Sequence, residues 1–425
     1  MQVEQHIVDI QTRLSDNSAK NLKDALNQIA TDKPDNAYIQ LAAAQSSAEQ
    51  GDIQGALKRV ENALGKMPDL TRALQLKARL ISFEKKSDLP ALEFLNAHLE
   101  KFPQNAELRL FYANALIDNE KRDEAKKELL KITDHKTAGG FALVFLGEIY
   151  LKESNWKDAN QVLKKAMLFP ETKENAQYML GETEELQGNH DTALEWYTQV
   201  GPSAFHVPAT LRAVLLLKQK KEYADAIYLL HNSTPITLEE QKQLLLAEMD
   251  ILNASQRHED TLELANEILT KIPDDPDVLY MRAITATKVK KWDIAELDLK
   301  KILKQNPNNA NALNALGFTL SFQKERIQEA LQHINQALAI APNNPDFIDS
   351  LGWTYYRAGD IPKALTYLKQ ANDLSDDATI AAHFGEVLWM NNQKDLAMGV
   401  WKKALKNPDA EELKETLNRL KVDLK

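Results

Sequence analysis

A small residue recurs along the chain with a period close to 34 residues. It occurs eleven times, ten times as alanine and once as threonine, and the ten successive spacings are 33, 34 or 35 residues. The positions are Ala56, Ala91, Ala125, Ala159, Ala193, Ala226, Thr261, Ala295, Ala330, Ala364 and Ala397. A fixed period of this length indicates a repeat architecture, in which each repeat is one supersecondary unit and only the stacked array buries a continuous core.

Other residue types keep the same phase. A large apolar residue follows the small residue by four positions, as at Leu163 and Trp401, and a proline often follows it by twelve, as at Pro273. Glycine or alanine often precedes it by twelve, as at Gly181 and Gly385. Proline ends a helix, small residues let two helices approach closely, and large residues fill the space between them. The pattern therefore predicts two antiparallel helices in each repeat.

Composition supports an all-α chain and excludes several functions. The 425 residues include only 14 glycines and 15 prolines, and the net charge is -10, which disfavours nucleic-acid binding. The absence of cysteine excludes thiolate zinc sites and cysteine nucleophiles. No apolar stretch is long enough to cross a membrane. The nine histidines are dispersed and no catalytic or phosphate-binding motif occurs. We therefore expect no catalytic residues, no cofactor, no metal site and no enzyme activity.

Residues 344–374 form the most regular copy of the repeat, with Leu351-Gly352, Tyr355, Ala364, Tyr367-Leu368 and Ala371 in phase. On these residues the chain resembles the tetratricopeptide-repeat family over nearly its full length. The resemblance implies an all-α fold, a right-handed superhelix (an α-solenoid) of about eleven helix-turn-helix repeats, with extra N-terminal helices and a C-terminal capping helix. The expected organisation is N-terminal helices over 1–36, repeats 1–5 over 37–200, an irregular junction containing repeat 6 over 201–241, repeats 7–11 over 242–408, and the cap over 409–425.

Three segments outside the regular repeats carry further expectations. The stripe of Val3, Ile7, Ile10 and Leu14 gives the first helix one narrow apolar face. The last residues carry a leucine stripe, from Leu413 to Leu424, that would cover the final hairpin. In the proline-rich junction over 201–241, where we expect the superhelix to change pitch, Thr237 and Glu240 have the spacing of a capping box.

The resemblance also implies a concave groove lined by the first helix of each repeat, where partner proteins bind. Phe141, Val144 and Glu148 would line it in the fourth repeat. The other candidate groove residues are Tyr178, Tyr280, Asn311, Asn314, Phe318, Trp353, Tyr356, Arg357 and Trp389. Because aromatic residues become denser toward the C-terminal repeats, we expect the recognition surface there. The alternative is that Trp353 and Trp389 pack between repeats. No repeat has the Lys and Asn pair with which some family members bind chaperone tails.

Two C-terminal segments, Asp349 to Tyr356 and Ala381 to Trp389, carry sequence features that are more specific than the general repeat pattern. They resemble proteobacterial tetratricopeptide lipoproteins of the outer membrane, one of which is the partner of a periplasmic carboxyl-terminal processing protease. The resemblance implies a non-catalytic adaptor that activates the protease and presents substrates such as peptidoglycan hydrolases. It makes the stripe of Val3, Ile7, Ile10 and Leu14 a protease-docking element.

The expected location is the periplasmic face of the outer membrane, provided that Met1 marks a truncation, since neither a signal peptide nor a lipobox cysteine precedes the repeats. The alternative is a cytoplasmic or inner-membrane-associated scaffold for assembly of a polysaccharide-export or pilus machine. A catalytic domain fused to the repeats is disfavoured, because the repeats leave no residues to form it.

Overall fold

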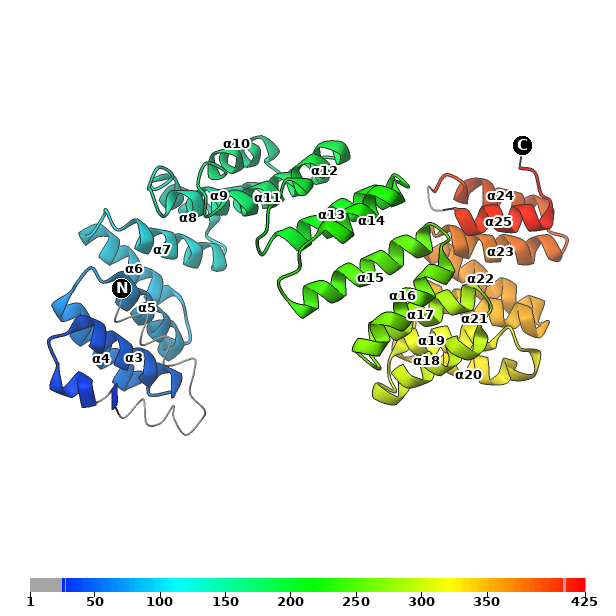
Figure 1. The fold of residues 1–425 in the computed structure, drawn as a ribbon, viewed down its shortest axis with the longest axis horizontal. Coiled ribbons are helices and arrows are strands. Elements are labelled where there is room, and N and C mark those ends of the chain that lie inside the picture. The colour runs from blue at the N-terminus through cyan, green and yellow to red at the C-terminus, as the bar shows by residue number, and fades with distance from the viewer. Residues whose placement is uncertain (1–24, 27, 408–409, 425) are drawn as a thin grey trace. The chain divides into compact units, whose positions relative to one another are not determined.

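The computed structural model describes residues 25–26, 28–407 and 410–424. Over these residues every regular element is helical and there is no strand, which confirms the all-α prediction (Figure 1). Residues 28–32 are helical, and the Ala30 carbonyl accepts a hydrogen bond from Gln40 Nε2 at 2.6 Å. The predicted stripe of Val3, Ile7, Ile10 and Leu14 lies outside the described residues.

Eleven antiparallel hairpins follow one another from residue 37 to residue 404, and this confirms the predicted array of about eleven repeats. A last helix, α25 (Glu411–Leu420), follows the array. The hairpins are α3 (Ala37–Glu49) with α4 (Ile53–Lys66), α5 (Thr71–Lys85) with α6 (Leu89–Lys101), α7 (Ala106–Asp118) with α8 (Arg122–Leu130), α9 (Gly139–Lys152) with α10 (Trp156–Ala166), α11 (Lys173–Leu186) with α12 (His190–Thr198), α13 (His206–Gln219) with α14 (Tyr223–Asn232), α15 (Leu238–Ala254) with α16 (His258–Lys271), α17 (Pro276–Lys288) with α18 (Trp292–Gln305), α19 (Ala310–Leu320) with α20 (Ile327–Ile340), α21 (Pro345–Ala358) with α22 (Ile361–Leu374), and α23 (Ala378–Met390) with α24 (Lys394–Ala404).

The periodic small residues lie where the two helices of a hairpin cross. Ala91 is 5% exposed and the other ten are fully buried. A Cβ added to Gly181 would lie 2.5 Å from the Tyr197 ring, and one added to Gly385 would lie 2.1 Å from Trp401 Nε1. The period therefore records a steric requirement that is repeated in each hairpin.

The turn between the two helices also repeats. In ten of the eleven hairpins it contains one residue with positive φ, between 51° and 83°: Gly51, Lys86, Glu120, Ser154, Gly188, Lys221, Gln256, Lys290, Gly359 and Asn392. Between α19 and α20 a 3₁₀ turn (Lys324–Arg326) replaces it. The shared turn geometry keeps the connections equally long, which explains why the period varies so little.

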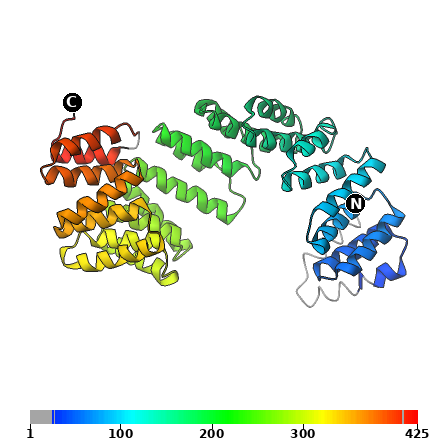
Figure 2. The same ribbon diagram turned by 180° about the vertical axis from the view of Figure 1, so that it is seen from behind.

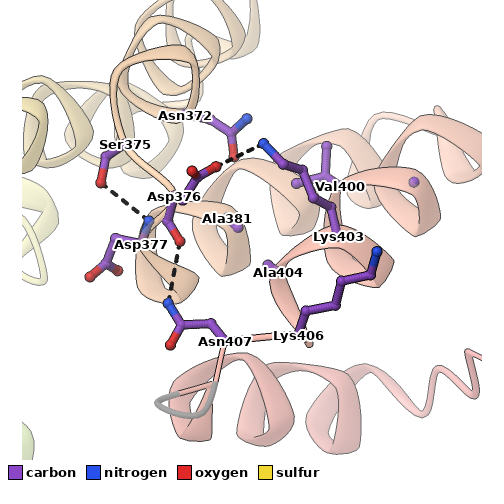
Figure 3. A pocket seen from close by; sticks show the side chains of 11 residues that line it. Asn372, Ser375, Asp376, Asp377, Ala381, Val400, Lys403, Ala404, Lys406 and Asn407 are labelled. Carbon is purple, nitrogen blue, oxygen red and sulfur yellow. Dashed lines mark hydrogen bonds and ion pairs between the residues drawn. The ribbon is translucent and has the colours of Figure 1, made fainter. Parts of the chain in front are cut away.

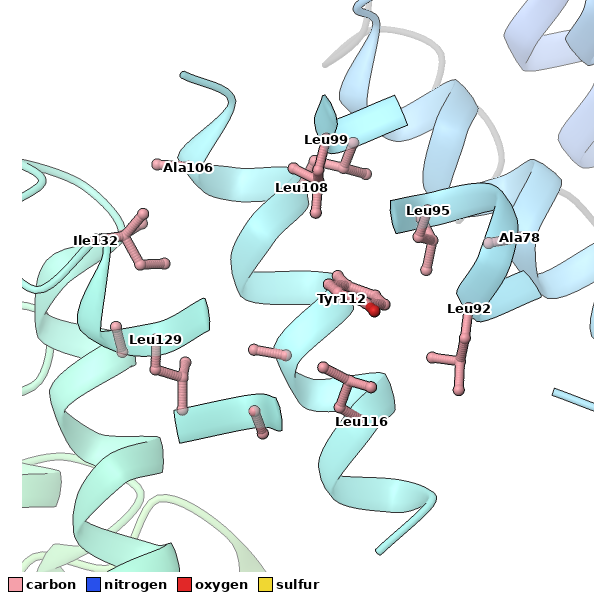
Figure 4. Close-up of a cluster of buried hydrophobic side chains, with 14 of the residues drawn as sticks. Ala78, Leu92, Leu95, Leu99, Ala106, Leu108, Tyr112, Leu116, Leu129 and Ile132 are labelled. Carbon is pink, nitrogen blue, oxygen red and sulfur yellow. The ribbon is translucent and has the colours of Figure 1, made fainter. Parts of the chain in front are cut away.

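The chain divides into two compact units, residues 1–213 and 214–425, and the division falls inside α13. Within each unit the hairpins stack side by side (Figures 1 and 2). Figure 4 shows how the core of unit 1 is built, with Leu95 of α6, Leu108 and Leu116 of α7 and Leu129 of α8 converging between the helices. None of these four leucines is more than 1% exposed.

In unit 2 the core continues into α25. Leu413 and Leu417 are buried against the cluster that contains the fully buried Trp401, as expected for a C-terminal capping helix. At the start of α15 the predicted capping box is present: Thr237 Oγ1 accepts from the Glu240 amide at 3.1 Å, and a Glu240 carboxylate oxygen accepts from the Thr237 amide at 3.1 Å.

The first helices of successive hairpins contact one another. For example, α5 contacts α7, and α7 contacts α9. No pair of second helices among the described residues makes comparable contact. The first helices therefore lie on the shorter side of each curved stack. We call this side the inner face.

Candidate functional site

The inner face of unit 1 contains an aromatic pocket of about 430 Å³. Its apolar wall consists of Leu110 and Phe111 on α7 with Phe141 and Phe145 on α9, and Glu107 lies at its edge. Phe141 is 41% exposed although it is a large apolar residue. Such exposure of adjacent aromatic rings is typical of protein-binding surfaces.

A second cavity of about 510 Å³, the acidic pocket, lies at the other end of α9. Its polar lining includes Glu148 and Lys152 of α9, Glu182 of α11 and Arg212 of α13. Asn175 and five apolar or aromatic side chains complete the lining: Leu151, Tyr178, Met179, Leu186 and Phe205. The predicted groove residue Tyr178 is thus half-buried in the pocket wall, its ring centroid 5.8 Å from that of Phe205.

Burial shapes the electrostatics of the acidic pocket. It raises the pKa of Glu148, an effect that the positive charge of Lys152 opposes. It also raises the pKa of Glu182, which the hydrogen bond from Tyr178 and the charge of Arg212 offset only in part. Both carboxylates are therefore poorly stabilised in their charged form by the protein around them.

Arg212 is already matched by an anion. Its Nη2 and Nε donate to Glu185 at 2.6 and 3.1 Å, and the Tyr197 hydroxyl donates to the same carboxylate at 2.8 Å. A bidentate pair of this kind neutralises the guanidinium locally. Glu148 and Glu182 then face Lys152 as the remaining cation of the lining, and the pocket keeps a negative balance.

One helix connects the two pockets. Phe141, Phe145, Glu148 and Lys152 follow one another on α9 at intervals of four, three and four residues, so they lie on one face of the helix. In sequence we assigned Val144 to this face, and that was wrong: Val144 is 2% exposed and packs in the core, while Phe145 lines the pocket. The 4-3-4 spacing of Phe141, Phe145, Glu148 and Lys152 was the signal that could have shown this.

Two further residues of the acidic pocket, Phe205 and Arg212, were not identified from the sequence. They lie in the segment that we interpreted as an irregular junction. In the structure this segment supplies a regular helix, α13, and Phe205 immediately precedes it.

The inner face of unit 2 differs from what the sequence suggested. Trp353 is only 8% exposed, and its ring stacks on His383 with centroids 4.2 Å apart and planes at 25°. The assignment of Trp353 to an open groove is therefore corrected. The physical reason is that the indole packs on His383 of the neighbouring first helix, α23, which covers it from solvent.

The helix α25 further reduces the accessible surface of unit 2. Its Arg419 donates to Glu386 of α23 at 2.9 Å, and its Glu412 lies 3.7 Å from His383 Nε2. Tyr356 is half-buried beside Glu386 and Arg419, and burial raises its pKa. Trp389 is also half-buried, with its ring centroid 5.7 Å from that of the buried Trp401.

The remaining predicted groove residues of unit 2 differ in their exposure. Tyr280, Asn314 and Phe318 are half-buried, whereas Asn311 and Arg357 are exposed. Phe318 and Arg357 both approach Phe322, with the Phe318 centroid at 5.3 Å and the guanidinium at 5.5 Å.

A larger cavity, of about 670 Å³, lies between the ends of α22 and α24 (Figure 3). Its polar side chains bind one another: Lys403 Nζ lies 2.7 Å from an Asp376 carboxylate oxygen, and Asn407 Nδ2 donates to the Asp376 carbonyl at 3.4 Å. Because these pairs join its opposite walls, we do not assign it a ligand.

The described residues contain no group of three or more His, Cys, Asp or Glu side chains that could hold a metal ion. None of their helices combines the length and the apolar character needed to cross a membrane.

Comparison with protein families gives two matches, both to models of the tetratricopeptide repeat. One covers residues 213–410 and the other residues 91–138, and together they include more than half of the 425 residues.

Several known proteins are similar to parts of the chain. A TPR repeat-containing protein of Pseudomonas aeruginosa is 35% identical over 211 residues, which are 50% of this chain and 36% of that protein. One of Methanocaldococcus jannaschii is 28% identical over 129 residues, 30% of this chain and 22% of that protein. The chain thus matches only about a third or less of the length of these relatives.

Among solved structures, the chain matches a thermophilic TPR protein of Thermus thermophilus at 26% identity and a TM-score of 0.39, over 42% of this chain and 99% of that one. A tetratricopeptide repeat protein of Parabacteroides merdae reaches 18% identity and a TM-score of 0.43, over 66% of this chain and 97% of that one.

Proposed function

Because the chain belongs to the tetratricopeptide-repeat family, we propose that it is a non-catalytic adaptor that binds other proteins through the inner face of unit 1. Proteins of this family act in general as scaffolds for protein interactions. The observation that carries the proposal is the pair of cavities joined by α9, one aromatic and one with a negative balance of charge. Apolar anchors beside a few placed charges are the composition of protein-binding surfaces.

We infer further that one partner is a periplasmic carboxyl-terminal processing protease, which the adaptor activates and supplies with substrates such as peptidoglycan hydrolases. This inference is supported by the runs Asp349 to Tyr356 and Ala381 to Trp389, which resemble outer-membrane adaptor lipoproteins. The corresponding location is the periplasmic face of the outer membrane. The apolar stripe of Val3, Ile7, Ile10 and Leu14 is the proposed docking element, since an amphipathic helix outside the array binds by burying its apolar face.

The test combines the purified chain with a purified processing protease. We expect the two to co-elute in size-exclusion chromatography and the chain to accelerate cleavage of a peptidoglycan hydrolase. Ile7→Asp with Ile10→Asp should abolish both effects, because it places two charges on the apolar stripe. Gln5→Asp with Thr12→Asp adds the same charge on the side of the helix opposite the stripe and should leave both effects unchanged.

Equal loss in the two variants, or no loss in either, would contradict the docking role of the stripe. A chain that binds no processing protease but binds components of a polysaccharide-export or pilus machine would overturn the protease assignment in favour of that alternative.

A further inference from the structure

The acidic pocket has two carboxylates that no cation of the protein contacts closely. Glu148 and Glu182 are half-buried and come from neighbouring first helices, α9 and α11. No ion pair involves either residue among the described contacts, whereas Arg212 is held by Glu185. Burial of a carboxylate without a cation is unfavourable and is relieved when a cation enters.

The walls of this pocket fit a long basic side chain. Leu151, Met179 and Leu186 offer apolar surface to a methylene stem, and the aromatic rings of Tyr178 and Phe205, with centroids 5.8 Å apart, line the same pocket. Lysine and arginine bury their stems against apolar surface and are attracted to aromatic faces. A volume of about 510 Å³ admits such a side chain with room to spare.

The position of the aromatic pocket determines where a second, apolar residue of the ligand would bind relative to that basic residue. Phe141 and Glu148 are seven residues apart on α9, as are Phe145 and Lys152. At ~1.5 Å of rise per residue, the two pockets are therefore roughly 10 Å apart along the helix. An extended polypeptide covers this distance in about three residues.

We propose that the inner face of unit 1 binds an extended polypeptide segment in which a lysine or arginine enters the acidic pocket and a large apolar residue, about three positions away, enters the aromatic pocket. This inference rests on the proposed protein-binding function and specifies the chemistry of the segment. Glu148 and Glu182 bind the cation, and Phe111, Phe141 and Phe145 bind the apolar side chain.

The test uses a fluorescein-labelled six-residue peptide with blocked ends, Phe at its second position, Lys at its fifth, and Ala or Ser elsewhere. Fluorescence anisotropy with the full chain measures its dissociation constant. We expect Glu148→Gln with Glu182→Gln to weaken binding at least tenfold. The matched control, Glu93→Gln with Glu195→Gln, removes two exposed carboxylates from α6 and α12 and should leave the dissociation constant unchanged.

Peptide variants separate the two pockets. Replacing Lys by norleucine should weaken binding to the wild type as much as the pocket substitutions do, with little further loss when both changes are combined. Replacing Phe by Ala should weaken binding to both proteins equally. Equal binding of the Lys and norleucine peptides, or no binding of any peptide to the wild type, would overturn the inference.

The outcome is independent of the protease assay. A chain that co-elutes with the processing protease but does not bind the peptide refutes only the proposed segment chemistry. A chain that binds the peptide but no processing protease supports the segment chemistry and contradicts the protease assignment.

Discussion

Each glycine at a helix crossing is constrained by the side chain that lies opposite it. At Gly352, an added Cβ would lie 2.7 Å from Leu368 Cγ and 2.9 Å from the Leu368 backbone nitrogen. A side chain could rotate away from such a clash, but the backbone of α22 could not. The two helices of this hairpin would have to move apart, and the core on both sides would follow.

We therefore predict opposite effects of the same substitution at two glycines of unit 2. Gly352→Ala should destabilise this unit by about 1–3 kcal/mol through overpacking. Gly399→Ala, at an exposed position inside α24 with no atom within 4 Å of the added Cβ, should stabilise it by about 0.5–1 kcal/mol because alanine favours the helix. Urea unfolding followed by tryptophan fluorescence measures both. A Gly352→Ala variant that is at least as stable as the wild type would show that the crossing is not sterically tight.

At the scale of elements, the contact between α21, α23 and α25 is electrostatic as well as apolar. His383 of α23 contacts Asp349 of α21 at 2.7 Å and lies 3.7 Å from Glu412 of α25. Burial lowers the pKa of His383, but the hydrogen-bonded Asp349 carboxylate and the charges of Glu412 and Glu386 together outweigh burial and raise it to about 9. The imidazole is therefore protonated in the folded chain at neutral pH.

This ion pair predicts a pH dependence with a definite sign. The pKa of His383 is about 9 when folded and about 6.5 when unfolded. Its contribution to stability is complete below pH ~6.5 and is lost as the pH rises to about 9. The stability difference between wild type and His383→Gln should accordingly fall by up to ~3 kcal/mol over this range. Urea unfolding of both proteins at several pH values measures it, and a constant difference would contradict the pair.

The helices themselves could be predicted from the sequence, but the surface that they expose could not. The fixed spacing of Gly147, Ala159 and Leu163 reports a steric requirement inside one hairpin, and this spacing can be read from the local sequence. Whether Trp353 meets solvent or His383 depends instead on the rotation of one first helix against the next. No local pattern encodes that rotation. The aromatic pocket and the acidic pocket of unit 1 likewise depend on contacts between neighbouring first helices.

The organisation of the whole molecule follows from a solenoid rule, namely that each repeat is stabilised mainly by its neighbours. Unit 2 contains a contact that departs from this rule. Lys221, in the turn between α13 and α14, lies 2.6 Å from Glu411 of α25, although 190 residues separate them in sequence. The last helix of the chain therefore contacts the turn of the sixth hairpin as well as the hairpins that precede it in sequence.

Deletion of residues 411–425 should for this reason affect two distant segments. We expect faster amide hydrogen exchange over α23 and α24, because Leu413 and Leu417 no longer cover their core, and over the turn around Lys221. The segment from α7 to α8, many repeats away along the chain, should keep its protection, because each repeat is stabilised mainly by its neighbours. Hydrogen–deuterium exchange with mass spectrometry compares the two proteins.

A milder variant, Glu411→Gln, should accelerate exchange in the turn alone. Uniform loss of protection along the whole chain would contradict the solenoid rule for this molecule, and an unchanged turn would contradict the contact between α25 and Lys221.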